Sequence, residues 1–117
     1  MSKRILIAED DEGILDAMKI MLEMEGYEVK TTVDGEALHD MEEELPDLLL
    51  LDIWMAGMDG RTICRYLKSQ QRTKHIPIIL MSASKESEKT ARDAGADAFL
   101  AKPFDFDELV DMVAKYI

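Results

Sequence analysis

The sequence has a single cysteine, no long apolar run and few basic residues. One cysteine, Cys64, cannot form an internal disulfide and suits a small core residue in a reducing cytosol. Apolar stretches such as Leu48–Leu51 are far shorter than the roughly 20 residues that a membrane helix needs. Residues Met1–Arg4 lead straight into a strand-like run, without the pattern of an export signal. We therefore expect a cytoplasmic protein without a membrane segment.

Acidic residues outnumber basic residues by 25 to 14, which gives a formal net charge of −11 at pH 7. Direct binding to nucleic acid requires clustered Lys and Arg, and here these residues are scattered, so we expect no nucleic-acid partner. The sequence also lacks internal repeats, low-complexity segments and linkers. Its 117 residues predict one domain, residues 1–117, with a hydrophobic core.

Short apolar runs predict the strands of a sheet. Ile5–Ala8, Leu48–Leu51 and Ile78–Met81 are continuous, as strands buried on both faces tend to be. Tyr27–Thr32 and Ala98–Ala101 are more mixed, which suits strands nearer the edges of the sheet. The sequence therefore predicts five strands.

Helical patterns separate these runs. The predicted helices cover residues near 13–25, a segment around Ala37 to Met41 that ends before Pro46, a segment marked by Ile63, Tyr66 and Leu67, residues 85–94, and a last helix with the apolar stripe Leu109, Met112, Val113 and Tyr116. The fourth of these has little beyond Ala91 and Ala94 to bury, so we expect it to be the most weakly held. Strand and helix alternate five times, which predicts a doubly wound α/β fold with a parallel sheet between two layers of helices.

Acidic residues follow two of the predicted strands. The first strand runs into Glu9, Asp10, Asp11 and Glu12, and the third runs into Asp52. Ligands of such sheets bind beyond the carboxyl ends of the strands. Two carboxylates about 4 Å apart repel each other by about 4 kcal/mol at an intermediate dielectric. A cluster of Glu9, Asp10 and Asp52 therefore indicates a counter-charge.

A divalent cation such as Mg²⁺ is the simplest counter-charge, because it prefers oxygen ligands and leaves room for a phosphate oxygen. The backbone carbonyl near Trp54 offers one more ligand. Alternatively, the acidic run only caps the following helix, since acidic groups favour helix N-termini. We prefer the capping role for Asp11 and Glu12, and the metal role for Glu9 and Asp10.

Two further strand ends carry polar side chains. Lys102 precedes Pro103, whose ring restricts its backbone to an extended conformation, and its ammonium can neutralise Asp52 and hold a phosphoryl oxygen. Ser82 can donate to a phosphoryl oxygen or satisfy a backbone group in a turn. Taken singly, a surface lysine and a turn serine are the commoner roles. Together with the acidic strand ends, the two residues favour a phosphoryl site.

The motifs resemble those of the response-regulator receiver family from Lys3 to Ile117. The matching segments are ILIAEDD (5–11), LLLLD (48–52), MDG (58–60), MSA (81–83), GAD (95–97) and KPF (102–104). The resemblance implies a flavodoxin-like fold with strand order 2-1-3-4-5 and five helices, Mg²⁺ as cofactor, and a phosphoryl donor that is a sensor histidine kinase or a histidine phosphotransfer protein. The domain is then a signalling phosphoacceptor and not an enzyme, and we expect no effector domain in this chain.

The resemblance also assigns roles to individual residues. Asp52 is the phosphoacceptor, Glu9 and Asp10 hold Mg²⁺, Ser82 is the switch hydroxyl and Lys102 pairs with the phosphate. Phosphorylation is then expected to change the face formed by the fourth helix, the fifth strand and the last helix, which would contact a target protein.

Other positions are less clear or depart from the family pattern. Phe99 resembles the rotating aromatic of the family, although ordinary strand burial explains it equally well. The loop Met55–Gly57 lacks the proline usually found before the glycine, which leaves the chemistry intact but loosens the loop. Trp54 lies two residues beyond Asp52, at a position that influences attack by water in the family. We expect Trp54 to lengthen the phosphorylated lifetime.

Three other interpretations compete with a receiver domain. Haloacid-dehalogenase-type phosphatases usually carry a second Asp two residues after the nucleophile, where this sequence has Trp54. A flavodoxin-like cofactor binder needs a phosphate-binding loop where Glu9–Glu12 stand, and these residues repel phosphate unless a metal intervenes. The completeness of the site argues against a vestigial scaffold. The sequence leaves open whether the domain is a stand-alone switch or a phosphorelay carrier.

Overall fold

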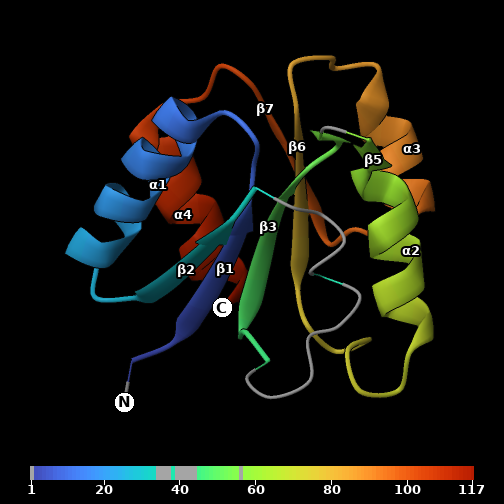
Figure 1. The fold of residues 1–117 in the computed structure, drawn as a ribbon, viewed down its shortest axis with the longest axis horizontal. Coiled ribbons are helices and arrows are strands. Elements are labelled where there is room, and N and C mark those ends of the chain that lie inside the picture. Colours follow the sequence, from blue (N-terminus) through green and yellow to red (C-terminus); the bar gives the residue numbers. More distant parts are fainter. Residues whose placement is uncertain (1, 34–37, 39–44, 56) are drawn as a thin grey trace.

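A five-stranded sheet with helices on both sides makes up most of the computed structural model, which describes residues 2–33, 38, 45–55 and 57–117 (Figure 1). In chain order the elements are β1 (Arg4–Ala8), α1 (Glu12–Met24), β2 (Glu28–Thr32), β3 (Leu48–Asp52), β4 (Trp54–Met55), β5 (Met58–Asp59), α2 (Gly60–Ser69), β6 (Ile78–Ser82), α3 (Ser87–Asp93), β7 (Ala98–Ala101) and α4 (Phe106–Tyr116). The five strands of the large sheet lie where the apolar runs predicted them.

The large sheet is parallel and has the order β2-β1-β3-β6-β7. Numbered by the strands of this sheet alone, this is the predicted order 2-1-3-4-5, and the two mixed strands lie at the edges as expected. Ala8 is in register with Leu51, and Asp52 is in register with Met81. Glu9, which follows β1, and the polar residues that end β3 and β6, Asp52 and Ser82, therefore lie at the same edge of the sheet.

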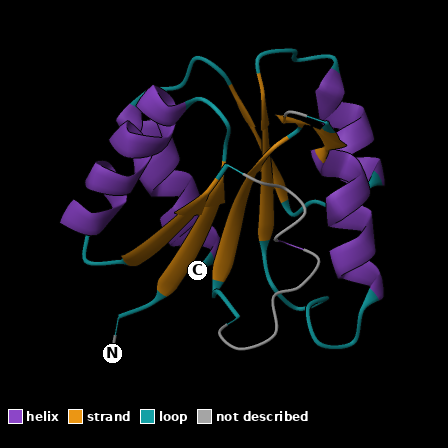
Figure 2. Cartoon of the chain, viewed as in Figure 1, coloured by secondary structure: helices purple, strands orange, loops and turns teal. Residues whose placement is uncertain are grey.

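Helices cover both faces of the sheet, α1 and α4 on one side and α2 and α3 on the other (Figure 2). The side chains of β3 alternate between these two layers: Leu48 and Leu50 pack with α1 and α4, and Leu49 and Leu51 pack with α2. This double burial explains why β3 is an uninterrupted run of leucines. Within the described residues, no helix combines the length and the apolarity required to cross a membrane.

The described part of the chain contains four helices, where the sequence predicted five. The helix expected around Ala37 to Met41 lies outside the described residues apart from Leu38, which is buried. Tyr66 lies in α2, the helix that it helped to predict, but its side chain is 39% exposed. The buried face of α2 consists instead of Gly60, Ile63, Cys64 and Leu67.

Cys64 is fully buried in this face, as expected of a small core residue. Burial raises the pKa of its thiol to about 11. A thiol with such a pKa stays protonated at neutral pH and is a poor nucleophile. Cys64 therefore contributes to packing and not to chemistry.

The segment after β3 forms a small antiparallel hairpin, β4 and β5, in which Trp54 pairs with Asp59 and Met55 pairs with Met58. Gly57, within its turn, has a φ of 73°, in the left-handed region that glycine adopts without steric strain. The sequence predicted a loop here. The pairing places Trp54 directly opposite the residue that precedes α2.

Helix α3 buries little, as the sequence indicated: its buried residues are Ser87 and Ala91, and Ala94 follows at its end. It is seven residues long, and its N-terminus has no side-chain cap, whereas Asp11 caps α1 by accepting a hydrogen bond from the Ile14 amide. The amides of α3 should therefore exchange with solvent before those of α1 and α4. Hydrogen exchange followed by NMR tests this order. Equal protection in α3 and α4 would show that α3 is held by more than its small apolar face.

Candidate functional site

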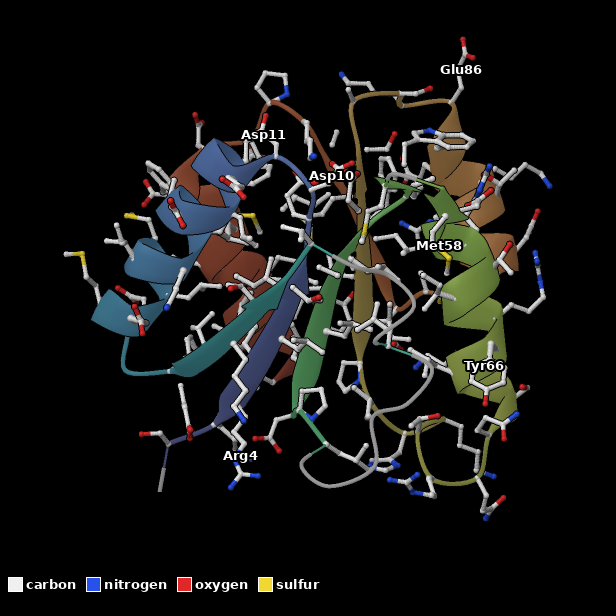
Figure 3. All side chains as sticks on the ribbon, viewed as in Figure 1. Arg4, Asp10, Asp11, Met58, Tyr66 and Glu86 are labelled. Carbon is white, nitrogen blue, oxygen red and sulfur yellow. The ribbon has the colours of Figure 1, made fainter. Side chains whose placement is uncertain are left out.

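Three carboxylates converge at the carboxyl ends of β1 and β3. One oxygen each from Glu9, Asp10 and Asp52 lies within 4.8 Å of the others. Glu9 is fully buried, Asp52 is 6% exposed and Asp10 is exposed. Figure 3 shows Asp10 between the end of β1 and the start of α1. The structure thus brings together the acidic residues that the sequence placed at one edge.

Lys102 reaches this cluster from the end of β7. Its Nζ pairs with Oε1 of Glu9 and lies 3.5 Å from Oδ2 of Asp52. The Lys102 backbone is anchored by a 2.9 Å hydrogen bond from its amide to the carbonyl of Ser82, and the Lys102–Pro103 peptide bond is cis. Asp52 was the expected partner of this ammonium. In the structure the closer partner is Glu9.

Within the described part of the chain, Glu9 is buried with one carboxylate oxygen unpaired and with too little positive charge around it. Its Oε2 is buried and has no hydrogen-bond partner among the residues that the structure describes. Burial, and after it the neighbouring Asp52 carboxyl, raise the pKa of Glu9 to about 7 against the opposing effect of Lys102. A buried acceptor left unpaired costs about 1–3 kcal/mol. Three carboxylates facing one ammonium, with a free buried oxygen, fit a hard divalent cation, which takes oxygen ligands.

Ser82 ends β6 beside this group and is 1% exposed. Its Oγ accepts a 3.0 Å hydrogen bond from the amide of Ser84, so the turn role considered in the sequence analysis is present. This bond uses an oxygen lone pair and leaves the hydroxyl hydrogen for another acceptor. The role of Ser82 toward a phosphoryl group stays a prediction.

Asp11 and Glu12 take the capping role that the sequence favoured. Oδ1 of Asp11 accepts a 3.2 Å hydrogen bond from the Ile14 amide, and Glu12 lies in the first turn of α1. Figure 3 shows Asp11 at the top of α1, one residue beyond Asp10. Successive acidic residues therefore divide between helix capping and the carboxylate cluster.

Phe99 is partly buried and packs against the core on the side of α2 and α3, so the ordinary packing role is present. Its rotation in response to phosphorylation stays a prediction. Trp54 is 56% exposed on β4, and the guanidinium carbon of Arg61 lies 4.7 Å from the centroid of its ring. The role of the Trp54 carbonyl as a metal ligand also stays a prediction.

Gly60 packs directly against the backbone of Asp52. A Cβ atom at Gly60 would lie 2.4 Å from the backbone oxygen of Asp52 and 2.9 Å from Cα of Ile53, far inside van der Waals contact. The Gly60 amide donates a 2.6 Å hydrogen bond to the Ile53 carbonyl. Only glycine permits this approach, which explains the glycine of the MDG segment and places the start of α2 against the backbone of Asp52.

Arg61, the first residue after Gly60, had no role predicted from the sequence. In the structure its guanidinium contacts Trp54, the Asp59 carboxylate and the hydroxyl of Thr90 on α3. The sequence pattern does not reveal these contacts, because they depend on the β4–β5 hairpin and on the packing of α2 against α3.

The sequence matches the response regulator receiver domain family over residues 5–114. The chain belongs to this family. A receiver domain is the phosphoacceptor domain of a two-component signalling system, which decides against the phosphatase and cofactor-binder alternatives. The DNA-binding dual master transcriptional regulator RpaA of Synechocystis sp. is 40% identical over 113 residues, 94% of this chain and 47% of RpaA. The receiver domain thus spans about half the length of this relative.

Solved structures show the same fold. A putative response regulator from Chloroflexus aurantiacus superposes with a TM-score of 0.93 at 33% identity and covers 99% of this chain and 98% of its own. The response regulator TrrA from Thermotoga maritima, solved in complex with Mg²⁺-BeF, has a TM-score of 0.87 at 35% identity, and the match covers 98% of this chain and 99% of TrrA.

Mg²⁺ should stabilise this receiver domain by binding only the folded state, by about 2.7 kcal/mol at a hundred times its Kd. Asp52→Asn should abolish most of this gain. It should not lower the Tm without Mg²⁺, because it removes one of three mutually repelling carboxylates. Thermal unfolding with and without Mg²⁺ measures both effects.

Asp11→Asn is the matched control, since it removes a neighbouring acid but keeps a side chain that can cap α1. It should retain the full response to Mg²⁺. An equal response in wild type and Asp52→Asn would place the ion outside the carboxylate cluster.

Proposed function

We propose that Asp52 accepts a phosphoryl group from a phosphohistidine of a sensor histidine kinase or a histidine phosphotransfer protein, in a reaction that requires Mg²⁺. The observation that carries this proposal is the convergence of a nearly buried Asp52 with two further carboxylates and the Lys102 ammonium at one edge of the sheet. We treat residues 1–117 as one receiver domain that assists its own phosphorylation and dephosphorylation and is not otherwise an enzyme. Its cytoplasmic location stays a prediction.

In the transfer step, a carboxylate oxygen of Asp52 attacks the phosphorus atom. The P–N bond to the donor histidine breaks, and its electron pair returns to the imidazole nitrogen. Lys102 stays protonated and offsets negative charge on the phosphoryl oxygens, from a position 3.5 Å from Oδ2 of Asp52. The Ser82 hydroxyl donates its hydrogen to another phosphoryl oxygen.

Glu9, Asp10 and Asp52 would hold the Mg²⁺ ion, with the backbone carbonyl of Trp54 as a further ligand. The unpartnered buried Oε2 of Glu9 supports this donor set. When bound, the ion supplies positive charge against the carboxylates and the phosphoryl oxygens. The complex of the relative TrrA with Mg²⁺-BeF supports the choice of metal.

The phosphoryl group adds about −1.5 to −2 charges beside the Lys102–Glu9 pair. Lys102 then turns from Glu9 toward the phosphate, and Ser82 turns to donate its hydroxyl hydrogen to a phosphoryl oxygen. This movement pulls the segment that leads into α3 toward the site and frees space for Phe99. It thereby shifts a pre-existing equilibrium between two conformations of the domain.

The face formed by α3, β7 and α4 is the proposed output surface. A shallow groove of about 410 Å³ lies on it, lined by Phe99 of β7 and by Met112 and Tyr116 of α4 among others. Its occupant would be a downstream protein, and nucleic acid is disfavoured by the scattered basic residues. Both a stand-alone switch and a phosphorelay carrier are compatible with this arrangement.

Incubation with Mg²⁺ and a small phosphodonor should add the mass of one phosphoryl group to the wild-type domain and none to Asp52→Asn. Intact-mass spectrometry measures the gain. Asp93→Asn, which removes an exposed acid on α3, is the matched control and should be labelled like wild type. Labelling of Asp52→Asn would move the acceptor to another residue, and an unlabelled wild type would favour a vestigial scaffold.

Trp54→Asn should shorten the lifetime of the phosphorylated domain, because a smaller polar side chain lets water approach Asp52 more easily. Loss of about 1.4 kcal/mol of protection would accelerate hydrolysis tenfold. Decay of the phosphorylated mass over time measures the rate. Trp54→Phe keeps an aromatic side chain and should decay like wild type, whereas equal rates for Trp54→Asn and wild type would remove any role of the indole.

A further inference from the structure

We propose that Arg61 is a positioning residue for the phosphorylation site, which holds Trp54 in place beside Asp52 and connects it to helix α3. The inference rests on the proposed function, because the lifetime that it explains is that of phosphorylated Asp52. It goes further by assigning the control of that lifetime to a residue outside the carboxylate cluster.

The guanidinium group of Arg61 joins three elements. Its carbon lies 4.7 Å from the centroid of the Trp54 ring on β4, within the range of a cation–π contact. Its Nε and Nη2 donate hydrogen bonds of 3.0 Å and 2.7 Å to the carboxylate of Asp59 on β5. Its Nη1 donates a 2.8 Å hydrogen bond to Oγ1 of Thr90 on α3. One planar group is therefore fixed in both position and orientation.

Asp59 holds the Arg61 fork from the position opposite Trp54. The two residues are paired across the β4–β5 hairpin, and Oδ1 of Asp59 also accepts a 2.9 Å hydrogen bond from the Arg61 amide. The Arg61 side chain holds the pKa of the Asp59 carboxyl below its usual value, so the pair is charged at neutral pH. A lysine could not reproduce this two-pronged contact, because its ammonium is a point charge without the planar fork.

Stability alone gives a weak reason for this arrangement. The side chains of Arg61 and Asp59 are 20% and 33% exposed, and ion pairs in contact with solvent contribute only about 0–1 kcal/mol to folding. What the contacts add is geometry: the stacked guanidinium restricts the rotamers of a tryptophan that is otherwise 56% exposed. The indole is thereby kept in one place near Asp52.

The base of Arg61 is tied to the phosphoacceptor itself. Its neighbour Gly60 packs against the backbone of Asp52 and Ile53, where not even a Cβ atom would fit. Trp54 lies two residues after Asp52, in the strand that leaves this close contact between Gly60 and the Asp52–Ile53 backbone. Arg61 therefore spans from the segment that packs against the acceptor backbone to the side chain that is proposed to shield the acceptor.

The far end of Arg61 reaches the helix with the smallest buried face. Oγ1 of Thr90 accepts from Arg61 and donates a 3.0 Å hydrogen bond to the carbonyl of Ser87, so the hydroxyl is used in both directions. The buried residues of α3, Ser87 and Ala91, are both small, so α3 has little apolar contact with the core. The hydrogen bond from Arg61 of α2 is therefore a notable part of what holds α3 in place. When α3 shifts, Arg61 must move with it or lose its hydrogen bond to Thr90, and its contact with the Trp54 ring changes as a result. By linkage, a partner that fixes α3 then alters the exposure of phosphorylated Asp52 to water.

Four variants separate this role from general stability. Arg61→Gln removes the charge and the fork, Arg61→Lys keeps only the charge, and Thr90→Val removes the α3 tether at similar size. Arg92→Gln is the matched control, because it removes an arginine whose ion pair with Glu88 lies on the surface of α3. Circular dichroism and Tm establish that each variant is folded.

The first measurement is acrylamide quenching of Trp54, the single tryptophan, in the unphosphorylated domain. Quenching should increase in Arg61→Gln, less so in Thr90→Val, and not in Arg92→Gln. This arm needs no phosphorylation, so it stands even if Asp52 is not the acceptor. Equal quenching of wild type and Arg61→Gln would overturn the positioning role.

The second measurement is the decay of the phosphorylated domain. Arg61→Gln should dephosphorylate several-fold faster than wild type, Arg61→Lys should not restore the wild-type rate, and Arg92→Gln should match wild type. The double variant of Arg61→Gln and Trp54→Asn should decay no faster than Trp54→Asn alone, because Arg61 acts through the indole. An unchanged rate in Arg61→Gln, or additive rates in the double variant, would overturn the proposal. Failure of the wild type to take up phosphate would instead count against the proposed function.

Discussion

Crowded negative charge at one end of a parallel sheet is the constraint on which the site depends. Glu9 and Asp52 follow adjacent strands whose register places Ala8 beside Leu51, and both carboxylates are buried. They cannot relax by moving apart, because leucines on both faces of β3 lock the strands into the core. Positive charge from outside the two strands relieves the repulsion while the carboxylates stay ionised. Lys102 supplies part of it, and the free oxygen of Glu9 leaves a place for a cation.

The same constraint explains how a small chemical event could reach a distant surface. Lys102 and Ser82 both compensate charge or polarity at the site in the unphosphorylated state, and each is joined to an element of the α3–β7–α4 side. A new phosphoryl group competes for these partners. Arg61 adds a separate connection on the other side of the acceptor, from the hairpin to Thr90. Polar bonds that can be exchanged thus link the site to α3, in addition to the apolar contacts of Ala91.

Much of the fold could be predicted because it follows from local patterns. An uninterrupted run such as Leu48–Leu51 is stable only when both faces are buried, which requires a central strand with helices on each side. The acidic residues after Ala8 and Leu51 then had to meet at one edge. Tyr66 shows the limit of such reasoning: its spacing correctly marked a helix with Ile63 and Leu67, but only the structure shows that its side chain lies outside the buried face of α2.

The sequence by itself determined the order of strands and helices, the acidic and basic strand ends and the family to which they point. These features depend on periodicity and on the chemistry of single residues. The tertiary structure alone decided that Glu9 is the closer partner of Lys102, that Gly60 touches the backbone of Asp52, and that Arg61 joins Trp54 to Thr90. Two of these contacts, Glu9 with Lys102 and Arg61 with Thr90, link residues far apart along the chain, and all depend on how the backbone and side chains pack once the chain has folded. No local pattern encodes that packing.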